Sequence, residues 1–421
     1  METKQSSFIH SLNAFNAFMR RQAEEAKGGK AKLALIGTGS RGMYHVNNLM
    51  QIPQAEVVAV CDIYPPHLEN AAKQYPQAKV YTNYLDAIHD PNVEGVLISS
   101  SLDTHAPVTL AALRAGKHVF CEKAMARTME ECKEVYDAYK TSGKVLYIGM
   151  QRLFDPKYLK GIELIRQGVL GEIVDIRNYW YRNNDWRRPL LKASDEKVIN
   201  WRLYRETSGG LMTELAAHQL QLGTWVYQDL PDYITGFGDI MYWKDGREVY
   251  DSVSVIYHYP NGKRMTFESI ISNKHYGMDE EVLGSKGTLE LAKGLLYLEE
   301  PTPASNILQF IQESERKEAK PVKVAGSSWR PEILYDTKGI PILENLQVHD
   351  GSNTTGAAVD DGSKSLVESF CYAMITGKPI PMLVEEAYYS SLLALLGNLA
   401  MEKRQVIAFP EEYKIPYEGI R

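Results

Sequence analysis

The stretch AKLALIGTGSRG, residues 31–42, joins a short apolar run to a glycine-rich turn and then to a helical pattern. Gly37, Gly39 and Gly42 within it have the spacing GxGxxG. After a strand, the first glycine permits a tight turn, the second lets the backbone approach a pyrophosphate, and the third allows close packing of helix against strand. Free N–H groups at the start of the helix attract phosphate oxygens. This stretch therefore predicts a dinucleotide site.

The pattern around this stretch continues to about residue 150. Apolar runs follow at AEVVAVCD (55–62), GVLISS (95–100), HVFCEK (118–123) and VLYIGM (145–150), with helical segments between them. Continuous apolar strands that alternate with helices are typical of a parallel sheet that is covered on both faces. We therefore expect residues 31–150 to form a doubly wound Rossmann domain of the α/β class.

Asp62 ends the second of these apolar runs, about 20 residues after Gly42. Its carboxylate is placed to accept hydrogen bonds from the adenosine ribose hydroxyls, and it would repel a 2′-phosphate. No arginine follows within VCDIYPPHLEN (60–70), where it could neutralise such a phosphate. The expected cofactor is therefore NAD rather than NADP.

After residue 150 the pattern changes to successive strands joined by short turns, which indicates an antiparallel sheet in a second, α+β domain over residues 151–421. Asn261–Gly262, between YHYP and KRMTF, is a strong hairpin signal. We expect the helical segments 363–377 and 385–404 to cover one face of this sheet. The stretch from about 301 to 362 has weak periodicity and is interpreted as an irregular insertion.

Composition and charge narrow the function classes. The 421 residues are 44% hydrophobic and 24% charged, with a net charge of −6, which is ordinary for a folded, soluble chain of two domains. No long basic run points to nucleic acid, and no stretch of about 18 apolar residues points to a membrane span. Residues 1–30 lack the apolar core of a secretory signal, and we expect them to form a helical extension.

The cysteines are few and scattered, and they form no CxxC pair. We therefore expect no disulfide framework, no bound metal and a reducing, cytoplasmic location. The four thiols belong to Cys61, Cys121, Cys132 and Cys371.

Six motifs in this order resemble those of the Gfo/Idh/MocA oxidoreductases. They are GTGSRG (37–42), CDIYP (61–65), DTHAPVTLAALRAGKHVFCEKAMA (103–126), GMQRLFDP (149–156), NWRLY (200–204) and SGGLMTELAAHQ (208–219). The resemblance implies a Rossmann domain, a second domain with an open and mostly antiparallel sheet, and a substrate held between them. It further implies hydride transfer between NAD and a sugar, cyclitol or sugar derivative, by a homodimer or homotetramer that associates through the open sheet faces.

The resemblance also implies roles for three residues. Lys123 stands in the family's Glu-Lys-Pro motif, where an ammonium near the nicotinamide would stabilise alkoxide character or take part in proton transfer. Ala124 replaces the usual proline, so we expect a looser backbone around this lysine. His218 is the candidate general base, and Glu214, four residues earlier, could orient it.

The expected site has two sets of residues. Around the cofactor we expect Gly37, Gly39, Ser40, Arg41, Gly42, Asp62, His105, Glu122, Lys123, Gln151, Trp201 and Arg202. Around the substrate we expect Lys123, Arg152, Tyr158, Tyr181, Glu214 and His218.

Two other functions stay open on the sequence. One branch of the superfamily resembles glycosidases that retain NAD and oxidise the sugar transiently around an elimination step. A non-catalytic NAD-binding protein is the second alternative, since Ala124 and Glu214 depart from the family pattern. Net production of NADH distinguishes the dehydrogenase from both.

Overall fold

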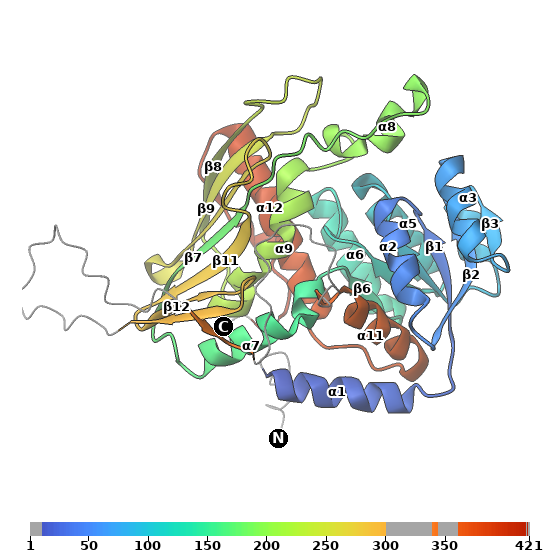
Figure 1. Cartoon of the computed structure of the whole chain (residues 1–421), viewed down its shortest axis with the longest axis horizontal. Coiled ribbons are helices and arrows are strands. Elements are labelled where there is room, and N and C mark those ends of the chain that lie inside the picture. Colours follow the sequence, from blue (N-terminus) through green and yellow to red (C-terminus); the bar gives the residue numbers. More distant parts are fainter. Residues whose placement is uncertain (1–10, 300–338, 344–360, 418, 420–421) are drawn as a thin grey trace, which may run out of the picture.

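The computed structural model describes residues 11–299, 339–343, 361–417 and 419. Two sheets lie on opposite sides of the molecule, with helices packed around the first and between the two (Figure 1). The chain therefore has the α/β class expected from its sequence, with a parallel sheet first and a mixed sheet second.

The first sheet is entirely parallel, with the order β3-β2-β1-β4-β5-β6. Its strands are β1 (Ala31–Ile36), β2 (Ala55–Cys61), β3 (Lys79–Tyr81), β4 (Gly95–Ile98), β5 (His118–Cys121) and β6 (Leu146–Ile148). The connecting helices are α2 (Ser40–Leu49), α3 (Pro65–Gln74), α4 (Tyr84–His89), α5 (Leu102–Arg114) and α6 (Met129–Ser142). This strand order confirms the predicted doubly wound topology.

The second sheet has nine strands in the order β14-β13-β12-β11-β7-β10-β9-β8-β15. They are β7 (Ile173–Trp180), β8 (Tyr233–Asp239), β9 (Ser252–His258), β10 (Arg264–Ile270), β11 (Met278–Gly284), β12 (Gly287–Glu290), β13 (Leu295–Leu298), β14 (Ile340–Pro341) and β15 (Ile407–Ala408). The β10–β7 pair is parallel and the other pairs are antiparallel. The sheet is therefore mostly antiparallel, as expected.

Residues Asn261 and Gly262 turn the chain between β9 and β10, where His258 pairs with Arg264. Both turn residues have positive φ angles, 64° and 78°. Such angles suit glycine and asparagine, and they match the twist of a two-stranded hairpin. The predicted hairpin is confirmed.

Helix α12 (Leu383–Lys403) lies between the two sheets, in contact with α6 and β6 on one side and with β8 and β15 on the other. Most of its residues are buried because it is covered on both sides. Helix α11 (Ser363–Thr376) lies elsewhere: it packs against β1, β5 and α2 of the first sheet. The expectation that both helices cover the second sheet was therefore wrong for α11.

The remaining helices and helical turns lie between and around these layers. They are α1 (Leu12–Glu25), η1 (Gln151–Phe154), α7 (Pro156–Arg166), η2 (Ala193–Asp195), α8 (Glu196–Ile199), η3 (Trp201–Leu203), α9 (Ala217–Gln219), η6 (Pro260–Gly262) and η7 (Glu411–Tyr413), with π-helical turns η4 (Met212–Ala216) and η5 (Gly223–Tyr227). Helix α1 belongs to the expected N-terminal extension and packs against α7 and α11. Most of the expected insertion, 301–362, lies outside the described residues.

Among the described residues, no helix is both long enough and apolar enough to cross a membrane.

Candidate active site

The cofactor pocket lies beyond the carboxyl ends of β1, β2 and β4. The order in which strands are added to this sheet reverses between β1 and β4, and ligands of doubly wound folds bind at such a switch point. A cavity of about 170 Å³ opens here, lined by Gly37, Gly39, Asp62 and Ser99 among others. Helix α2 begins at this cavity without a side-chain cap on its N-terminus, so its free N–H groups are available to a phosphate.

The three glycines fit the roles that their spacing predicts. Gly37 has φ +86°, and a Cβ there would lie 2.5 Å from the backbone nitrogen of Ser100. A Cβ on Gly42 would lie 2.2 Å from the Gly37 carbonyl oxygen, so helix and turn can pack closely only without one. A Cβ on Gly39 would meet only the His67 ring, at 3.4 Å, and would point into the space left for a ligand. The residues present therefore fit a dinucleotide.

Asp62 lies in the cofactor pocket and is itself held in place. One carboxylate oxygen accepts hydrogen bonds from Thr38 N, at 2.7 Å, and Thr38 Oγ1, at 3.1 Å. The other accepts from Tyr64 N at 2.8 Å. Because an ionised carboxylate has about four acceptor positions, Asp62 can still accept from a ribose hydroxyl.

A larger cleft of about 610 Å³ adjoins this pocket. Arg41, Ser99, Ser100, Arg188, Trp201 and Arg202 line both spaces. The cleft alone is lined by His105, Glu122, Lys123, Gln151, Trp180, Arg182, Asn184, Trp186, Arg187, Glu214, Leu215, His218 and Asp361. A molecule in the cleft would therefore lie directly beside one in the cofactor pocket.

Glu122 joins the two spaces through a buried ionic cluster. One of its oxygens lies 2.6 Å from Arg41 Nε and 2.7 Å from His45 Nε2. Burial opposes ionisation, but Arg41 and His45 hold the pKa of Glu122 well below its usual range. Glu122 thus holds Arg41 beside the glycine turn. Lys123 is the next residue in the chain, so the anchored Glu122 also limits where Lys123 can lie.

Lys123 reaches into the cleft, where its Nζ donates to the Glu214 carbonyl oxygen at 3.0 Å. Burial lowers the pKa of this ammonium, although Glu214 and Glu122 oppose the shift. The Lys123–Ala124 peptide bond is cis. Ala124 is buried, and its carbonyl oxygen lies 2.8 Å from His105 Nδ1. Lys123 is thus positioned by its contact with Glu214, and Ala124, which replaces the family's usual proline, by its contact with His105.

His218 faces the same cleft from α9. Its ring is buried, with the centroid 5.9 Å from that of Trp180, and its Nδ1 has no hydrogen-bond partner among the described residues. Burial and the charges of Lys123 and Arg152 hold the pKa of His218 well below its usual value. The imidazole is therefore neutral at physiological pH and can accept a proton.

Glu214 does not orient His218 as expected. Its Oε2 accepts from Arg202 Nε at 2.8 Å, and its backbone carbonyl holds Lys123. Residues 212–216 form a π-helical turn, so the regular helix assumed for Glu214 and His218 is not formed. Glu214 and His218 both line the cleft, but Glu214 accepts hydrogen bonds from Arg202 and Lys123 and so positions those two side chains.

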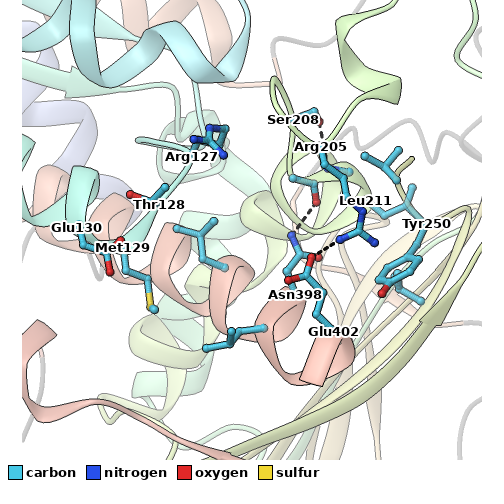
Figure 2. A pocket seen from close by; sticks show the side chains of 16 residues that line it. Arg127, Thr128, Met129, Glu130, Arg205, Ser208, Leu211, Tyr250, Asn398 and Glu402 are labelled. Carbon is cyan, nitrogen blue, oxygen red and sulfur yellow. Dashed lines mark hydrogen bonds and ion pairs between the residues drawn. The ribbon is translucent and has the colours of Figure 1, made fainter. Parts of the chain in front are cut away.

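A second cavity, of about 390 Å³, lies behind this segment, between the starts of α6 and η4 and the end of α12. Figure 2 shows Arg205 paired with Glu402. Asn398 Nδ2 donates to the Gly209 carbonyl oxygen at 2.8 Å. None of its lining residues has a buried side-chain polar atom without a partner in the described chain. The hydrogen bond from Asn398 therefore helps to hold the turn that leads to Glu214 and His218.

Three of the expected substrate residues lie away from the cleft. Arg152 is buried between Glu280, at 2.9 Å, and the Tyr158 hydroxyl, also at 2.9 Å, which itself donates to Glu280. The Tyr181 hydroxyl donates to Glu268 at 3.0 Å. None of the three is among the residues that line the cleft, because an ionic cluster buries the first two and the third points to the other face of the sheet. Gln151, expected beside the cofactor, does line the cleft.

The end of β7 and the segment after it supply cleft residues that the sequence analysis did not assign to the site: Trp180, Arg182, Asn184, Trp186, Arg187 and Arg188. A signal was present, because NYWYRNNDWRRP (178–189) concentrates arginine and aromatic residues at the end of a strand.

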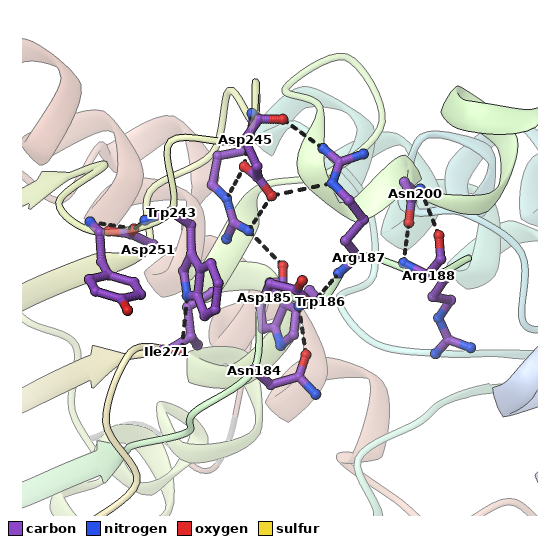
Figure 3. A network of polar contacts seen from close by, with 12 residues as sticks. Asn184, Asp185, Trp186, Arg187, Arg188, Asn200, Trp243, Asp245, Asp251 and Ile271 are labelled. Carbon is purple, nitrogen blue, oxygen red and sulfur yellow. Dashed lines mark hydrogen bonds and ion pairs between the residues drawn. The ribbon is translucent and has the colours of Figure 1, made fainter. Parts of the chain in front are cut away.

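A polar network holds this segment in place (Figure 3). Arg247 donates to the Asp185 carbonyl at 2.6 Å and pairs with Asp245 at 2.8 Å. Arg187 lies 3.3 Å from the same Asp245 carboxylate, and the Arg188 backbone nitrogen donates to Asn200 at 2.7 Å. Contacts within the chain therefore hold the cleft wall. No group of three or more metal-ligating side chains occurs among the described residues.

Comparison with known proteins matches both domains to family models. Residues 31–150 match the Gfo/Idh/MocA oxidoreductase family with an NAD-binding Rossmann fold, and residues 158–290 match the Gfo/Idh/MocA C-terminal domain. The chain belongs to the Gfo/Idh/MocA family of oxidoreductases. Its cofactor is NAD, as the glycine turn and Asp62 predicted.

The chain is similar to three named proteins in different degrees. The chain is 28% identical over 271 residues to the inositol 2-dehydrogenase/D-chiro-inositol 3-dehydrogenase of Lactiplantibacillus plantarum, covering 62% of this chain and 71% of that protein. It is 28% identical over 215 residues to a glycosyl hydrolase family 109 protein of Shewanella baltica, covering 46% of each. A levoglucosan dehydrogenase solved with NADH and levoglucosan has the same fold, with a TM-score of 0.68 at 18% identity over 91% of this chain and all of that one (100%).

Proposed function

We propose that this NAD-dependent oxidoreductase transfers hydride between the nicotinamide and a hydroxyl-bearing carbon of a sugar, cyclitol or sugar derivative. The observation that carries the proposal is the junction of the two spaces, where Lys123 and His218 face a cleft that shares its wall with the cofactor pocket. The inositol dehydrogenase activity named for the Lactiplantibacillus relative supports the substrate class.

Lys123 would stabilise the substrate oxygen. NAD, when bound, accepts the hydride from the carbon, and negative charge grows on the attached oxygen as the bond to hydrogen breaks. An ammonium held in a buried site stabilises that charge more than water would. The backbone carbonyl of Glu214 fixes its position from 3.0 Å away.

His218 would take the hydroxyl proton. A general base must be unprotonated before the reaction, and the lowered pKa of His218 keeps the ring neutral. Its position in the same cleft as Lys123 lets one group hold the oxygen while the other receives the proton.

A second candidate function has an observation of its own. The Shewanella relative carries the name of a glycosyl hydrolase family, which keeps the NAD-retaining glycosidase among the functions to test. Such an enzyme would use the same lysine and histidine, but it would return the hydride to the sugar after elimination and release an aglycone.

The test is absorbance of reduced nicotinamide while the purified protein receives NAD and a panel of free sugars, cyclitols and aryl glycosides. We expect a steady rise with at least one polyol. Release of the aryl group without any rise would favour the glycosidase. NAD binding without either signal would favour a non-catalytic NAD-binding protein and contradict the proposal.

We further propose a homo-oligomer that associates through the open face of the second sheet, and a cytoplasmic location. Exposed apolar side chains on that face support the first, including Tyr233, Phe237 and Ile256. The free, buried state of all four cysteines fits the second.

A further inference from the structure

The charges of the cleft do not balance. Six lysine or arginine side chains and three carboxylates line it. Arg41 is paired with Glu122 at 2.6 Å, and Arg202 with Glu214 at 2.8 Å. These pairs use two of the three carboxylates inside the cleft.

Two more charges are accounted for at the edges. Arg187 pairs with Asp245 and Glu196, which lie outside the cleft lining. Asp361, the third carboxylate, accepts from the Ser363 nitrogen at 3.0 Å and from the Tyr44 hydroxyl at 3.4 Å, on the α2 side. Arg182, Arg188 and Lys123 are therefore left without a carboxylate partner among the described residues.

Arg188 belongs with the cofactor. It lines the cofactor pocket as well as the cleft, and its guanidinium donates to the Ser40 hydroxyl at the start of α2. Anions bind at that helix N-terminus, so the pyrophosphate of NAD would supply the negative charge that Arg188 lacks. Lys123 is the group that meets the reacting oxygen.

Arg182 is different, because it lines the cleft and does not line the cofactor pocket. Its guanidinium lies 4.8 Å from the centre of the Trp180 ring, which holds it over the cleft wall. The charge nearest to it on this wall is that of Arg202, and no carboxylate offsets it. The Arg182 guanidinium is therefore an exposed, charged group.

Arg182 is exposed in the cleft, and a cleft lined by an excess of positive charge attracts a ligand of the opposite charge. We propose that the substrate is an anionic sugar or cyclitol, whose carboxylate or phosphate binds Arg182 while Lys123 and His218 act on a hydroxyl elsewhere in the molecule. This rests on the proposed function for the reaction itself. A guanidinium suits either group, because its planar fork matches both carboxylate and phosphate oxygens.

The test compares matched ligand pairs on the NADH-loaded protein by calorimetry. D-Glucuronate against D-glucose probes a carboxylate, and myo-inositol 1-phosphate against myo-inositol probes a phosphate. We expect the anionic member of one pair to bind about 10-fold or more tightly than its neutral partner, which is about 1.4 kcal/mol. The pair that shows the preference identifies the anionic group.

Variants then locate the effect. Arg182→Gln should remove the preference and leave the neutral affinity within about twofold, whereas Arg182→Lys should keep part of it because the charge remains. Arg114→Gln is the matched control, an exposed arginine on α5 that pairs with Glu134 at 3.0 Å.

Two outcomes overturn the inference. One is a panel in which no anionic member binds more tightly than its neutral partner, including a panel in which none binds. The other is a preference that survives in Arg182→Gln. Arg182-dependent binding without turnover would instead contradict the proposed reaction and leave the anion site standing, so the two failures are distinguishable.

Discussion

At the scale of single residues, either His218 or Lys123 could accept the substrate proton, and the pH dependence of the reaction tells which of them is the base. Burial lowers the pKa of both, but His218 starts from a value near 6.5 and Lys123 from one near 10.4. If His218 is the base, kcat/KM for polyol oxidation should fall only below pH 6.5. If kcat/KM instead begins to fall above pH 6.5 as the pH is lowered, and still does so in His218→Gln, the base is Lys123.

Substitution measures how much each group contributes. Lys123→Met and His218→Gln should each lower kcat by about 100-fold or more, as expected when a positioned acid, base or charge is lost. Lys27→Met and His89→Gln, at exposed positions on the surface, serve as controls. Full turnover in either cleft variant would remove that residue from the mechanism.

Asp62 gives a prediction about cofactor choice. Asp62→Ala removes the acceptor for the ribose hydroxyls and also the contacts that hold Thr38. We expect NAD affinity to fall by about 10-fold or more, the usual effect of losing a hydrogen bond to a charged group, and discrimination against NADP to narrow. Fluorescence titration with NADH and NADPH measures both. An unchanged ratio of the two affinities would contradict the role, and Asp137→Ala on α6 is the control.

At the scale of elements, Gly210 sets the start of the segment that carries Glu214 and His218. It has φ +63°, and a Cβ there would lie 3.0 Å from Val249 Cβ. Gly210→Ala should lower the free energy of unfolding by about 1–2 kcal/mol. It should also lower kcat, because a shifted η4 moves the Glu214 carbonyl away from Lys123.

Gly143→Ala is the control that separates the cost of a positive φ angle from the cost of the close approach to Val249. Gly143 ends α6 at φ +65°, with nothing within 4 Å of an added Cβ. It should lose stability in urea unfolding without losing kcat. Equal losses of kcat in the two variants would show that the Gly210 turn has no special link to the site.

The elements also show which parts of the fold are readable from sequence. Gly37 to Gly42 and Asn261–Gly262 were predictable because their conformations depend on glycine and asparagine locally. The π-helical turn η4 was not, because apolar spacing over five residues hardly differs between a π-turn and an α-turn. Helix α11 was assigned to the wrong sheet because an apolar helix near a chain end does not encode which layer it joins.

At the scale of the whole molecule, the cleft depends on parts far apart in sequence. Lys123 follows a strand of the first sheet, whereas Arg182 and His218 come from the second domain. Motifs and the family resemblance led to Lys123 and His218. Arg182 was missed because its role follows from a charge balance across the two domains, and Tyr158 was wrongly placed because nothing in the sequence showed that Glu280 would bury it with Arg152.

The open face of the second sheet predicts an oligomer. Phe237 and Tyr233 on β8 and Ile256 on β9 are exposed there, and apolar faces of this kind mark interaction sites. We expect sedimentation velocity at micromolar concentration to show a dimer or tetramer that Phe237→Lys with Ile256→Lys dissociates. Met50→Lys, at an exposed apolar residue on α2's end, should leave the assembly intact. A wild-type monomer would contradict the prediction.

Glu386 on α12, the helix between the two sheets, should contribute a stability that falls with rising pH. Burial raises the pKa of Glu386 to about 7, although Thr224 and Tyr417 donate hydrogen bonds to it. The unfolded-state pKa is near 4.3, so between those values the folded chain binds more protons than the unfolded chain. The contribution of Glu386 to the free energy of unfolding should therefore decrease across this interval, by up to about 3 kcal/mol, and level off above pH 7.

Glu386→Gln tests this without changing the size of the side chain, since the amide cannot ionise. Urea unfolding at pH 5 and pH 8 should show the variant gaining on the wild type by about 1–3 kcal/mol at the higher pH. Glu69→Gln, at an exposed position on α3, should follow the wild type at both values. If the difference between Glu386→Gln and wild type is the same at pH 5 and pH 8, Glu386 is ionised in the folded chain and α12 tolerates a charge between the sheets.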